Sequence, residues 1–543
     1  MLFIANEIDF SKRYNTDKEN LDNKMIGQFL ILRNRQDDDD VYLCDFAIVT
    51  KKRVHYYNEF TRLLVTYQGT QGNAAELPMN SENFVNVDNA KKEGFNFFTQ
   101  VISDESYYSL SSHYSKVRTK KIFSTLQDLG LMRKNGTSSK DYDLAKKCLL
   151  KHNRSYYAFN KGIEYLFTRD SKEFVKKTSI DQLDIQLEGI TKNESLHLNF
   201  SHSVLGRIPI NIFIGKNGAG KSYTIECIIK RYLEGRHQDL ASNINKIIVI
   251  SNTISDKYPS TIRKFKSNKR LSDDNTNEDY EYFSTIRGCK FNQTDGVQKF
   301  NFTTHIEEML VRDMTEQLPF SSLDILEKAI KKNLSCSIIG LDSNLTSFKS
   351  LRELIFSAKK HFNETDGEYL RLDHVFITRN GREAKLSSGQ ENFILMISCL
   401  LTSIQNNSLV FIDELENFLH PNFISQAMKI LKDCLIDTNS ICIIATHSLH
   451  IAREIPKEGV TIFERFNDAS SFVIYNPGIE SYSCNLQLMS NYIFNTKEEE
   501  SIFDSTLRNI ANKYKTKKKL INELGGSTSR DILLSIADRI NEN

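Results

Sequence analysis

The nine cysteines of this 543-residue sequence include no C-x-x-C pair, and several of them lie inside apolar runs. This pattern argues against a zinc site or a disulfide framework and is typical of a reduced, cytoplasmic protein. The longest apolar stretch, around residues 393–404, is too short and too polar to span a bilayer, and no signal-like apolar block opens the chain. The formal net charge is only +2, so the charge of the whole chain identifies no partner. We therefore expect a soluble protein that functions in the cytoplasm, away from membranes.

One short stretch combines glycines with a basic residue between two apolar segments. In "NIFIGKNGAGKSYTIECII" (211–229), Gly215, Gly220, Lys221 and Ser222 fit the pattern G-x-x-x-x-G-K-[ST]. In a loop of this kind, backbone N–H groups cradle nucleotide phosphates. The apolar residues before it predict a buried strand, and the residues after it predict a helix whose N-terminus faces the phosphates. The alternative is a glycine-rich turn that binds nothing, and the flanking segments make it the weaker interpretation.

Two later segments place polar groups at the ends of predicted strands. In "SLVFIDELENFLHP" (408–421), four apolar residues lead to Asp413 and Glu414, which is the Walker B arrangement. "SICIIATHS" (440–448) is a second buried strand, which ends near His447. Parallel α/β sheets bind ligands at the carboxyl ends of their strands. Taken singly, an acidic pair can cap a helix and a histidine can be structural, but this order after a P-loop favours a nucleotide site.

A further motif precedes the Walker B strand. "KLSSGQENFILMISCLL" (385–401) contains Leu-Ser-Ser-Gly-Gln at the start of a predicted amphipathic helix. It resembles the LSGGQ signature of ABC-type ATPases, with Ser388 where glycine is usual; its alternative is a plain helix cap. In that family the signature contacts nucleotide bound to the opposite subunit, so the resemblance implies a homodimer that encloses two ATP molecules.

The resemblance also implies roles for single residues, with ATP and Mg²⁺ as ligands. The loop residues Asn217, Gly218, Gly220 and Lys221 are expected to bind the phosphates, and Ser222 and Asp413 to bind the metal. Glu414 is expected to activate the attacking water, and His447 to contact the γ-phosphate. Ser387 and Gly389 are expected to contact the nucleotide bound to the partner subunit. The usual Q-loop glutamine has no counterpart after the next strand, "NKIIVISNTISDKYP" (245–259), where Asn252 is the candidate replacement.

Three sequence features indicate which branch of the ABC-type ATPases this chain resembles. "DELENFLHP" followed by "ATHS" resembles the soluble branch that contains SMC-type, RecF-like and OLD-like ATPases. Residues 253–380 lack the sustained heptads of an SMC coiled coil, so we expect a compact, mainly helical insertion there. "VISNTISDKY" and "EYFSTIRG" (281–288) look most like the PtuA ATPases of Septu antiphage systems, including those attached to retrons.

The PtuA resemblance implies partners. An HNH nuclease subunit is expected, together with a reverse transcriptase and its ncRNA/msDNA where a retron is present. The segments after His447 predict a hairpin and then helices, without the acidic pattern of an OLD-like Toprim nuclease, so the nuclease is expected on a separate chain. The alternatives are an SMC/RecF-like DNA-repair or recombination ATPase that clamps DNA and, with less support, a transporter subunit.

The predicted fold class is α/β: an ABC-type P-loop NTPase core (179–490), an N-terminal α/β accessory domain (1–178) and a helical C-terminal tail (491–543). Strands are expected at 28–32 and 41–49. Three N-terminal segments mix basic residues with tyrosines and are candidates for gripping nucleic acid, although solvated lysines above core tyrosines are the simpler interpretation. They are "KKRVHYY" (51–57), "SKVRTKK" (115–121) and "KHNRSYY" (151–157). The basic segment "NKYKTKKKL" (512–520) in the tail has the same two interpretations.

Overall fold

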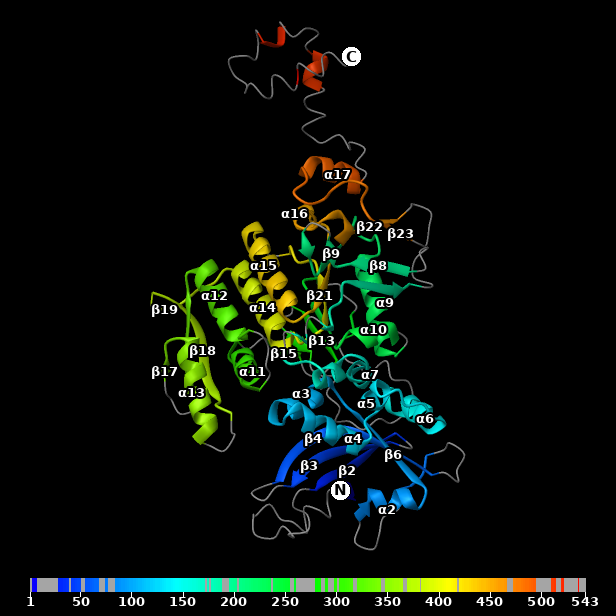
Figure 1. Ribbon diagram of the computed structural model, residues 1–543. Helices are drawn as coiled ribbons and strands as arrows, with labels where there is room; N and C mark the ends of the chain where they lie inside the picture. The colour runs from blue at the N-terminus through cyan, green and yellow to red at the C-terminus, as the bar shows by residue number, and fades with distance from the viewer. Residues whose placement is uncertain are drawn as a thin grey trace. The chain divides into compact units, whose positions relative to one another are not determined.

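The computed structural model forms two compact units, Met1–Tyr482 and Ser483–Asn543 (Figure 1). The predicted division between residues 178 and 179 lies inside the first unit, and the second unit begins eight residues before the predicted tail. The structure describes residues 2–6, 28–38, 41–49, 54–67, 74–76, 84–170, 173–174, 177–187, 195–202, 205–235, 238–253, 258–259, 279–284, 289–291, 297–299, 302–315, 320–342, 347–364, 369–380, 382–417, 419–465, 472–494, 509–513, 519–521 and 536.

The N-terminal part contains a six-stranded sheet in the order β5-β1-β2-β3-β4-β6. Strands β1 and β2 are parallel, and the other neighbours are antiparallel. The two strands expected from the sequence are confirmed as β2 and β3. The bounds are β1 Leu2–Asn6, β2 Phe29–Asp38, β3 Val41–Val49, β4 Val54–Tyr67, β5 Phe84–Asn86 and β6 Phe95–Val101.

Helices pack on this sheet, and aromatic side chains fill part of the core between them. The Phe60 ring stacks on Phe46 with 5.1 Å between ring centroids and on Phe123 with 6.1 Å, which joins strands β3 and β4 to helix α4. The helices are α2 Val87–Lys92, α3 Asp104–His113, α4 Lys116–Leu126, α5 Leu129–Lys134, α6 Lys140–Leu149, α7 Asn153–Asn160 and the 3₁₀ helix η3 Gly162–Leu166.

The central sheet has the order β15-β14-β13-β12-β20-β21-β11-β22-β23, and β13 through β22 run parallel. Every residue of β11, β12, β20 and β21 is buried, because helices cover both faces: α9 and α10 on one, α14 and α15 on the other (Figure 1). The strands are β11 Ile210–Ile214, β12 Lys246–Ser251, β13 Tyr280–Ser284, β14 Cys289–Phe291, β15 Val297–Lys299, β20 Ser408–Asp413, β21 Ile441–Thr446, β22 Val460–Arg465 and β23 Phe472–Tyr475; the helices are α9 Lys221–Leu233, α10 Gln238–Asn243, α14 Ser388–Ser403 and α15 Pro421–Asp437.

One buried asparagine ties the N-terminal helices to this sheet. Asn407, directly before β20, accepts hydrogen bonds on Oδ1 from the Tyr157 hydroxyl at 3.1 Å and the Thr178 hydroxyl at 3.2 Å. Its amide Nδ2 donates to the Thr178 carbonyl at 2.9 Å. The strand that leads to Asp413 therefore begins at a contact with the N-terminal part, within the same compact unit.

The described part of the segment 253–380 combines helices with strands. Besides α11, α12 and α13 it holds β16, β17 and β18, which form an antiparallel sheet with β19, just after the segment, in the order β17-β16-β18-β19. Its strands β13, β14 and β15 extend the central sheet. The β-branched runs "SIIGLD" and "HVFIT" favour strands, and packing against helices stabilises them as a sheet. The elements are α11 Phe302–Thr315, α12 Ser322–Leu334, β16 Ser337–Asp342, β17 Ser347–Phe348, α13 Leu351–Glu364, β18 Leu372–Arg379 and β19 Arg382–Glu383.

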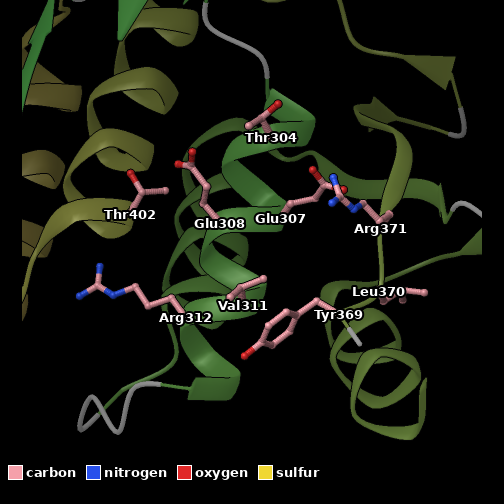
Figure 2. Close-up of a pocket in the computed structure, with 9 residues that line it drawn as sticks. All are labelled: Thr304, Glu307, Glu308, Val311, Arg312, Tyr369, Leu370, Arg371 and Thr402. Atoms are coloured by element: carbon pink, nitrogen blue, oxygen red, sulfur yellow. The ribbon is translucent and has the colours of Figure 1, made fainter. Parts of the chain in front are cut away.

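Helix α11 of this insertion is fixed to its neighbours around a cavity of about 420 Å³ (Figure 2). Arg312 Nη1 donates to the Leu401 carbonyl on α14 at 2.6 Å, and the Glu307 carboxylate accepts from the Leu372 backbone N–H at 2.5 Å. Arg312 thus joins α11 to α14, the helix that carries the signature motif, while Glu307 joins α11 to β18 within the insertion.

The remaining elements are short. The hairpin predicted after His447 is confirmed as the antiparallel pair β22–β23. Helix α17 lies in the second unit and spans the predicted boundary at 490/491, while much of the basic segment 512–520 lies outside the described residues. In the part of the chain that the structure describes, no helix has both the length and the apolar character needed to cross a membrane. The elements are β7 Gln182–Gln186, β8 Ser195–Asn199, β9 Ser201–His202, β10 Gly206–Arg207, α16 Leu449–Ala452, η5 Lys457–Gly459 and α17 Leu486–Phe494.

Candidate functional site

The glycine-rich loop between β11 and α9 adopts backbone conformations that require glycine. Gly218 and Gly220 have φ of 77° and 102°, and Gly220 is the N-cap of α9. A Cβ on Gly215 would lie 2.3 Å from the Phe463 carbonyl oxygen. Asn217, inside the loop, is exposed. The first backbone N–H groups of α9 have no partner within the helix, so the loop and the helix N-terminus form a surface suited to an anion.

Lys221 lies folded over this loop. Its Nζ donates to the carbonyl oxygens of Gly215 at 2.9 Å and Lys216 at 3.3 Å, and the residue is only 5% exposed. Burial lowers the pKa of the Lys221 ammonium, while the carboxylates of Glu414 and Asp413 oppose that shift. A phosphate at the loop would offer this ammonium a charged acceptor in place of two carbonyls.

Ser222 and Asp413 meet as the sequence predicts. The Ser222 hydroxyl donates to Asp413 Oδ1 at 3.1 Å across 191 positions of sequence, and Asp413 is 1% exposed. A hydroxyl and a carboxylate are the oxygen ligands that Mg²⁺ prefers, so these two residues fit a magnesium ion beside the phosphate loop.

Tyr258 is a site residue that the sequence analysis missed. Its hydroxyl donates to Asp413 Oδ2 at 2.8 Å, so both carboxylate oxygens of Asp413 accept a hydrogen bond from the protein. Tyr258 is the last residue of "VISNTISDKY", a segment considered above only for its family resemblance, and no periodicity there marks the tyrosine as a site residue.

Glu414 is held in a strained conformation next to Asp413. Its φ of 58° is in the left-handed region, and its backbone N–H donates to the Ala445 carbonyl on β21 at 2.8 Å. Glu414 Oε2 lies 2.6 Å from His447 Nδ1. Burial, followed by the charges of Glu416 and Asp413, raises the pKa of the Glu414 carboxyl to about 7, against the opposing effects of His447 and Lys221.

Glu416 is the second residue that the sequence analysis missed. Its Oε1 accepts from the Thr446 hydroxyl at 2.5 Å and from the His447 backbone N–H at 2.9 Å. Glu416 also lies 3.3 Å from His447 Nδ1. The ligand atoms of Glu414, Glu416 and His447 lie within 4.8 Å of one another. The acidic spacing in "DELE" is the signal that could have identified Glu416.

Asn252 lies at the same edge of the sheet as the Walker B residues. Its backbone N–H donates to the Asp413 carbonyl at 3.0 Å, and its own carbonyl accepts from Asn417 Nδ2 at 3.1 Å. The residue is 3% exposed. The structure therefore brings Asn252 beside Asp413, as a residue after β12 in a parallel sheet must be.

The signature motif forms the start of α14. Ser387 is its N-cap, and a capping box joins the Ser387 hydroxyl to the Gln390 N–H and the Gln390 side chain to the Ser387 N–H. Ser387 is exposed and Gly389 is half-buried. Within the described residues, no hydrogen bond or ion pair joins this motif to the glycine-rich loop of the same chain.

Comparisons with known proteins agree with this site. Residues 338–453 match the family model described as "AAA domain, putative AbiEii toxin, Type IV TA system", a range that includes the signature, the Walker B residues and His447. "Protein ea59" of Escherichia phage lambda is 23% identical over 52% of this chain and 54% of its own length, so the chain spans about half of that relative. "Probable ABC transporter ATP-binding protein p29" of Mesomycoplasma hyorhinis is 26% identical over 37% of this chain and 71% of its own length.

Solved structures give weaker matches. CbiO1 from Clostridium perfringens, part of an ABC transporter complex, is 15% identical, with coverage of 52% of this chain and 87% of its own and a TM-score of 0.21. Stu0660 of Streptococcus thermophilus is 12% identical, with coverage of 65% and 91% and the same TM-score. We base the fold assignment on the strand order and the site residues, because TM-scores this low do not establish a shared fold. The family match over residues 338–453 and the match to an ATP-binding relative show that this chain is similar to AAA- and ABC-type ATPases.

Proposed function

We propose that this chain hydrolyses ATP as the motor subunit of an antiphage defence complex and controls a nuclease carried on a separate chain. The observation that carries the ATPase part is the convergence of four strand ends on one edge of the central sheet. The loop after β11, Asn252 after β12, Asp413 and Glu414 at the end of β20, and His447 after β21 all lie there.

Each residue has a task that its surroundings suit. Lys221 and the N-terminus of α9 bind the phosphates of ATP, and Ser222 and Asp413 hold Mg²⁺, which when bound neutralises phosphate charge. Glu414 accepts the proton of the attacking water on its carboxylate; a pKa of about 7 matches a general base that operates near neutral pH. His447, 2.6 Å from Glu414, orients that carboxylate. As the resemblance to ABC-type ATPases implies, it would also contact the γ-phosphate.

The proposed active form is a head-to-tail homodimer. The exposed N-terminus of α14 supports this form, since Ser387 and Gly389 have no described contact with their own glycine-rich loop and remain free to contact nucleotide held by a second copy. The Gly389→Asp change tests the dimer sharply. An acidic residue in the first turn stabilises a helix, so the variant should fold, while its charge repels the partner's phosphates and abolishes ATP-dependent dimerisation.

The defence role rests on the resemblance to PtuA ATPases. It predicts an HNH nuclease as the partner, with a reverse transcriptase and its ncRNA/msDNA where a retron is present. The matched family description names a toxin of a type IV toxin–antitoxin system, which is compatible with a role in defence. Nucleic acid is then bound by this chain, by its partners or by both.

Mass spectrometry of the native complex tests this role. The complex is purified through this subunit from its own operon with ATP and Mg²⁺. A stable nuclease subunit supports the proposal, and a bound RNA–DNA hybrid supports the retron-associated form. An ATP-dependent dimer that binds DNA without a nuclease would replace it with the SMC/RecF-like repair function, and recovery with an integral membrane subunit would replace it with transport, the role in the name of the Mesomycoplasma relative.

A further inference from the structure

A second cavity, of about 750 Å³, lies between the N-terminal helices and the ATPase core, away from the glycine-rich loop. Its lining residues come from α5, α6 and α7 on one side and from α10 and the two residues after α9 on the other. Figure 1 shows these helices beside one another. Its volume is in the range of sites for small organic ligands. No step proposed for ATP hydrolysis uses its residues.

The lining of this cavity is strongly basic. It includes the cations Arg133, Lys146, Lys147 and Lys151 and one carboxylate, Glu234. Lys146 also pairs with Asp143 on the same helix at 2.9 Å, so its charge is partly balanced there. The remaining excess of positive charge favours an anionic ligand.

Aromatic rings hold two of these cations in place. The Arg133 guanidinium lies 4.7 Å from the ring centroid of Phe159, and Lys146 Nζ lies 5.0 Å from that of Tyr142. A third ring, Tyr156, is half-buried at the cavity wall. Cations stacked on aromatic rings lose less side-chain entropy on binding, because much of their freedom is already gone.

Arg133 is the most firmly placed of these groups. Its Nη1 and Nη2 donate to the side-chain and backbone oxygens of Asn160 at 3.2 and 3.0 Å. A guanidinium whose orientation is already fixed can bind a phosphate and stack on a base with less loss of entropy.

We propose that this cavity binds a nucleotide unit, with its phosphate on Arg133 and Lys147 and its base against Tyr156 and the guanidinium plane of Arg133. Cations combined with aromatic faces are the chemistry by which proteins bind single-stranded nucleic acid without sequence preference. The unit belongs either to a single strand or to a free nucleotide. This inference does not depend on the proposed control of a nuclease.

The cavity also adjoins the part of the chain that carries the candidate ATP site. Glu234 and Gly235 at the cavity directly follow α9, the helix whose first residue is Lys221. Its thirteen residues span about 20 Å at 1.5 Å per residue. The proposed ligand contacts come from α5, α6 and α7, and the two residues after α9 line the same cavity, so a bound ligand lies beside the end of the helix that begins at the phosphate site.

Fluorescence anisotropy with a labelled single-stranded 12-mer tests the proposal on the full chain, with ADP and Mg²⁺ present to fill the first site. The double variant Arg133→Gln/Lys147→Glu should bind at least tenfold more weakly and lower the slope of log K against log salt by roughly 0.7 for each phosphate contact removed. Lys140→Glu is the matched control, because Lys140 is exposed on the same helix α6 but outside the cavity. Both proteins should keep the basal ATPase rate of the unmodified chain, which shows that they fold.

Competition with UMP distinguishes the two sources of the nucleotide unit. Displacement of the 12-mer by UMP at comparable affinity identifies a free nucleotide as the ligand, and a lack of displacement identifies a single strand. Equal affinity of the double variant and the unmodified chain for the 12-mer and for UMP would overturn the proposal, as would an absence of binding by the unmodified chain.

Discussion

Tyr258 donates its hydroxyl hydrogen to Asp413 Oδ2 at 2.8 Å, on the side of the carboxylate opposite the bond from Ser222. Asp413 is thus fixed by two donors from segments on either side of it in the sheet. Both Tyr258 and Asp413 are buried, at 6% and 1% exposure, so a lost bond would not be replaced freely by water. The orientation of the proposed metal ligand therefore depends on a tyrosine outside the glycine-rich loop, Walker B and signature motifs.

The Tyr258→Phe change should lower the free energy of unfolding by about 1.5–3 kcal/mol, the usual cost of a hydrogen bond to a charged group. Tyr280→Phe is the matched control: Tyr280 is equally buried, at 6%, but its hydroxyl donates to a neutral carbonyl, that of Pro259, at 2.8 Å. The Tyr280→Phe change should lower the free energy of unfolding by only about 0.5–1.5 kcal/mol. Denaturant titration of the nucleotide-free proteins measures both, and equal losses would contradict the role given to Tyr258.

The Glu414→Gln change should abolish steady-state ATP hydrolysis while ATP and Mg²⁺ still bind. The amide keeps the shape of the side chain but cannot accept the proton of the attacking water. The variant should therefore accumulate as an ATP-bound dimer, visible by light scattering after size exclusion. Glu454→Gln, at an exposed position outside the site, is the control. Unaltered turnover in Glu414→Gln would show that another group is the base.

Glu416 should act as a positioning residue for His447. It accepts the Thr446 hydroxyl and the His447 backbone N–H, so it fixes the end of β21. Glu416→Ala should lower kcat by about 10- to 100-fold with little change in KM, since misplaced groups slow chemistry more than binding. Glu416→Gln retains an oxygen acceptor and should recover most of the rate. If alanine and glutamine reduce kcat equally, the charge of Glu416 rather than its geometry is what matters.

Asn407 should contribute strongly to stability because it joins the N-terminal helices to β20. Asn407→Ala leaves the buried Tyr157 hydroxyl and the Thr178 groups without their partner and should cost about 2–4 kcal/mol. Asn380→Ala is the matched control, since Asn380 has a similar φ of 54°, against 57° for Asn407, but is exposed. Both changes carry the same backbone strain. Equal losses of stability in denaturant would show that the buried hydrogen bonds add little.

The sequence predicted the parts of the site that are written as short contiguous patterns. The glycine-rich loop, Asp413, Glu414 and His447 could be found because each follows an apolar run whose strand character is local. Tyr258 and Asn407 could not be found, because their partners lie 155 and 250 positions away and no local pattern records such contacts. The sheet β16–β19 was missed for a similar reason: the partners of short strands are set by tertiary packing.

The last prediction concerns Asp128, a fully buried carboxyl in the N-terminal part. Its Oδ1 accepts from the Tyr107 hydroxyl at 2.7 Å and the Leu131 N–H at 3.0 Å, and burial raises its pKa to about 6. A raised pKa means that the folded state binds the proton more tightly than the unfolded chain. The burial of Asp128 therefore does not lower the free energy of unfolding at a pH below about 4, the pKa of this carboxyl in the unfolded chain. As the pH rises from 4 to 6 the free energy of unfolding falls, and at neutral pH the loss is about 3 kcal/mol.

Asp128→Asn removes this charge and keeps an oxygen in place of Oδ1. The stability difference between Asp128→Asn and the unmodified chain should therefore shift in favour of the variant as the pH rises from 4 to 6, and then remain constant. Thermal unfolding of both proteins measured across pH 4–8 gives this difference. A difference that does not change with pH would mean that Asp128 has the same proton affinity in the folded and unfolded chains, because a purely structural effect of the amide shifts all pH values equally.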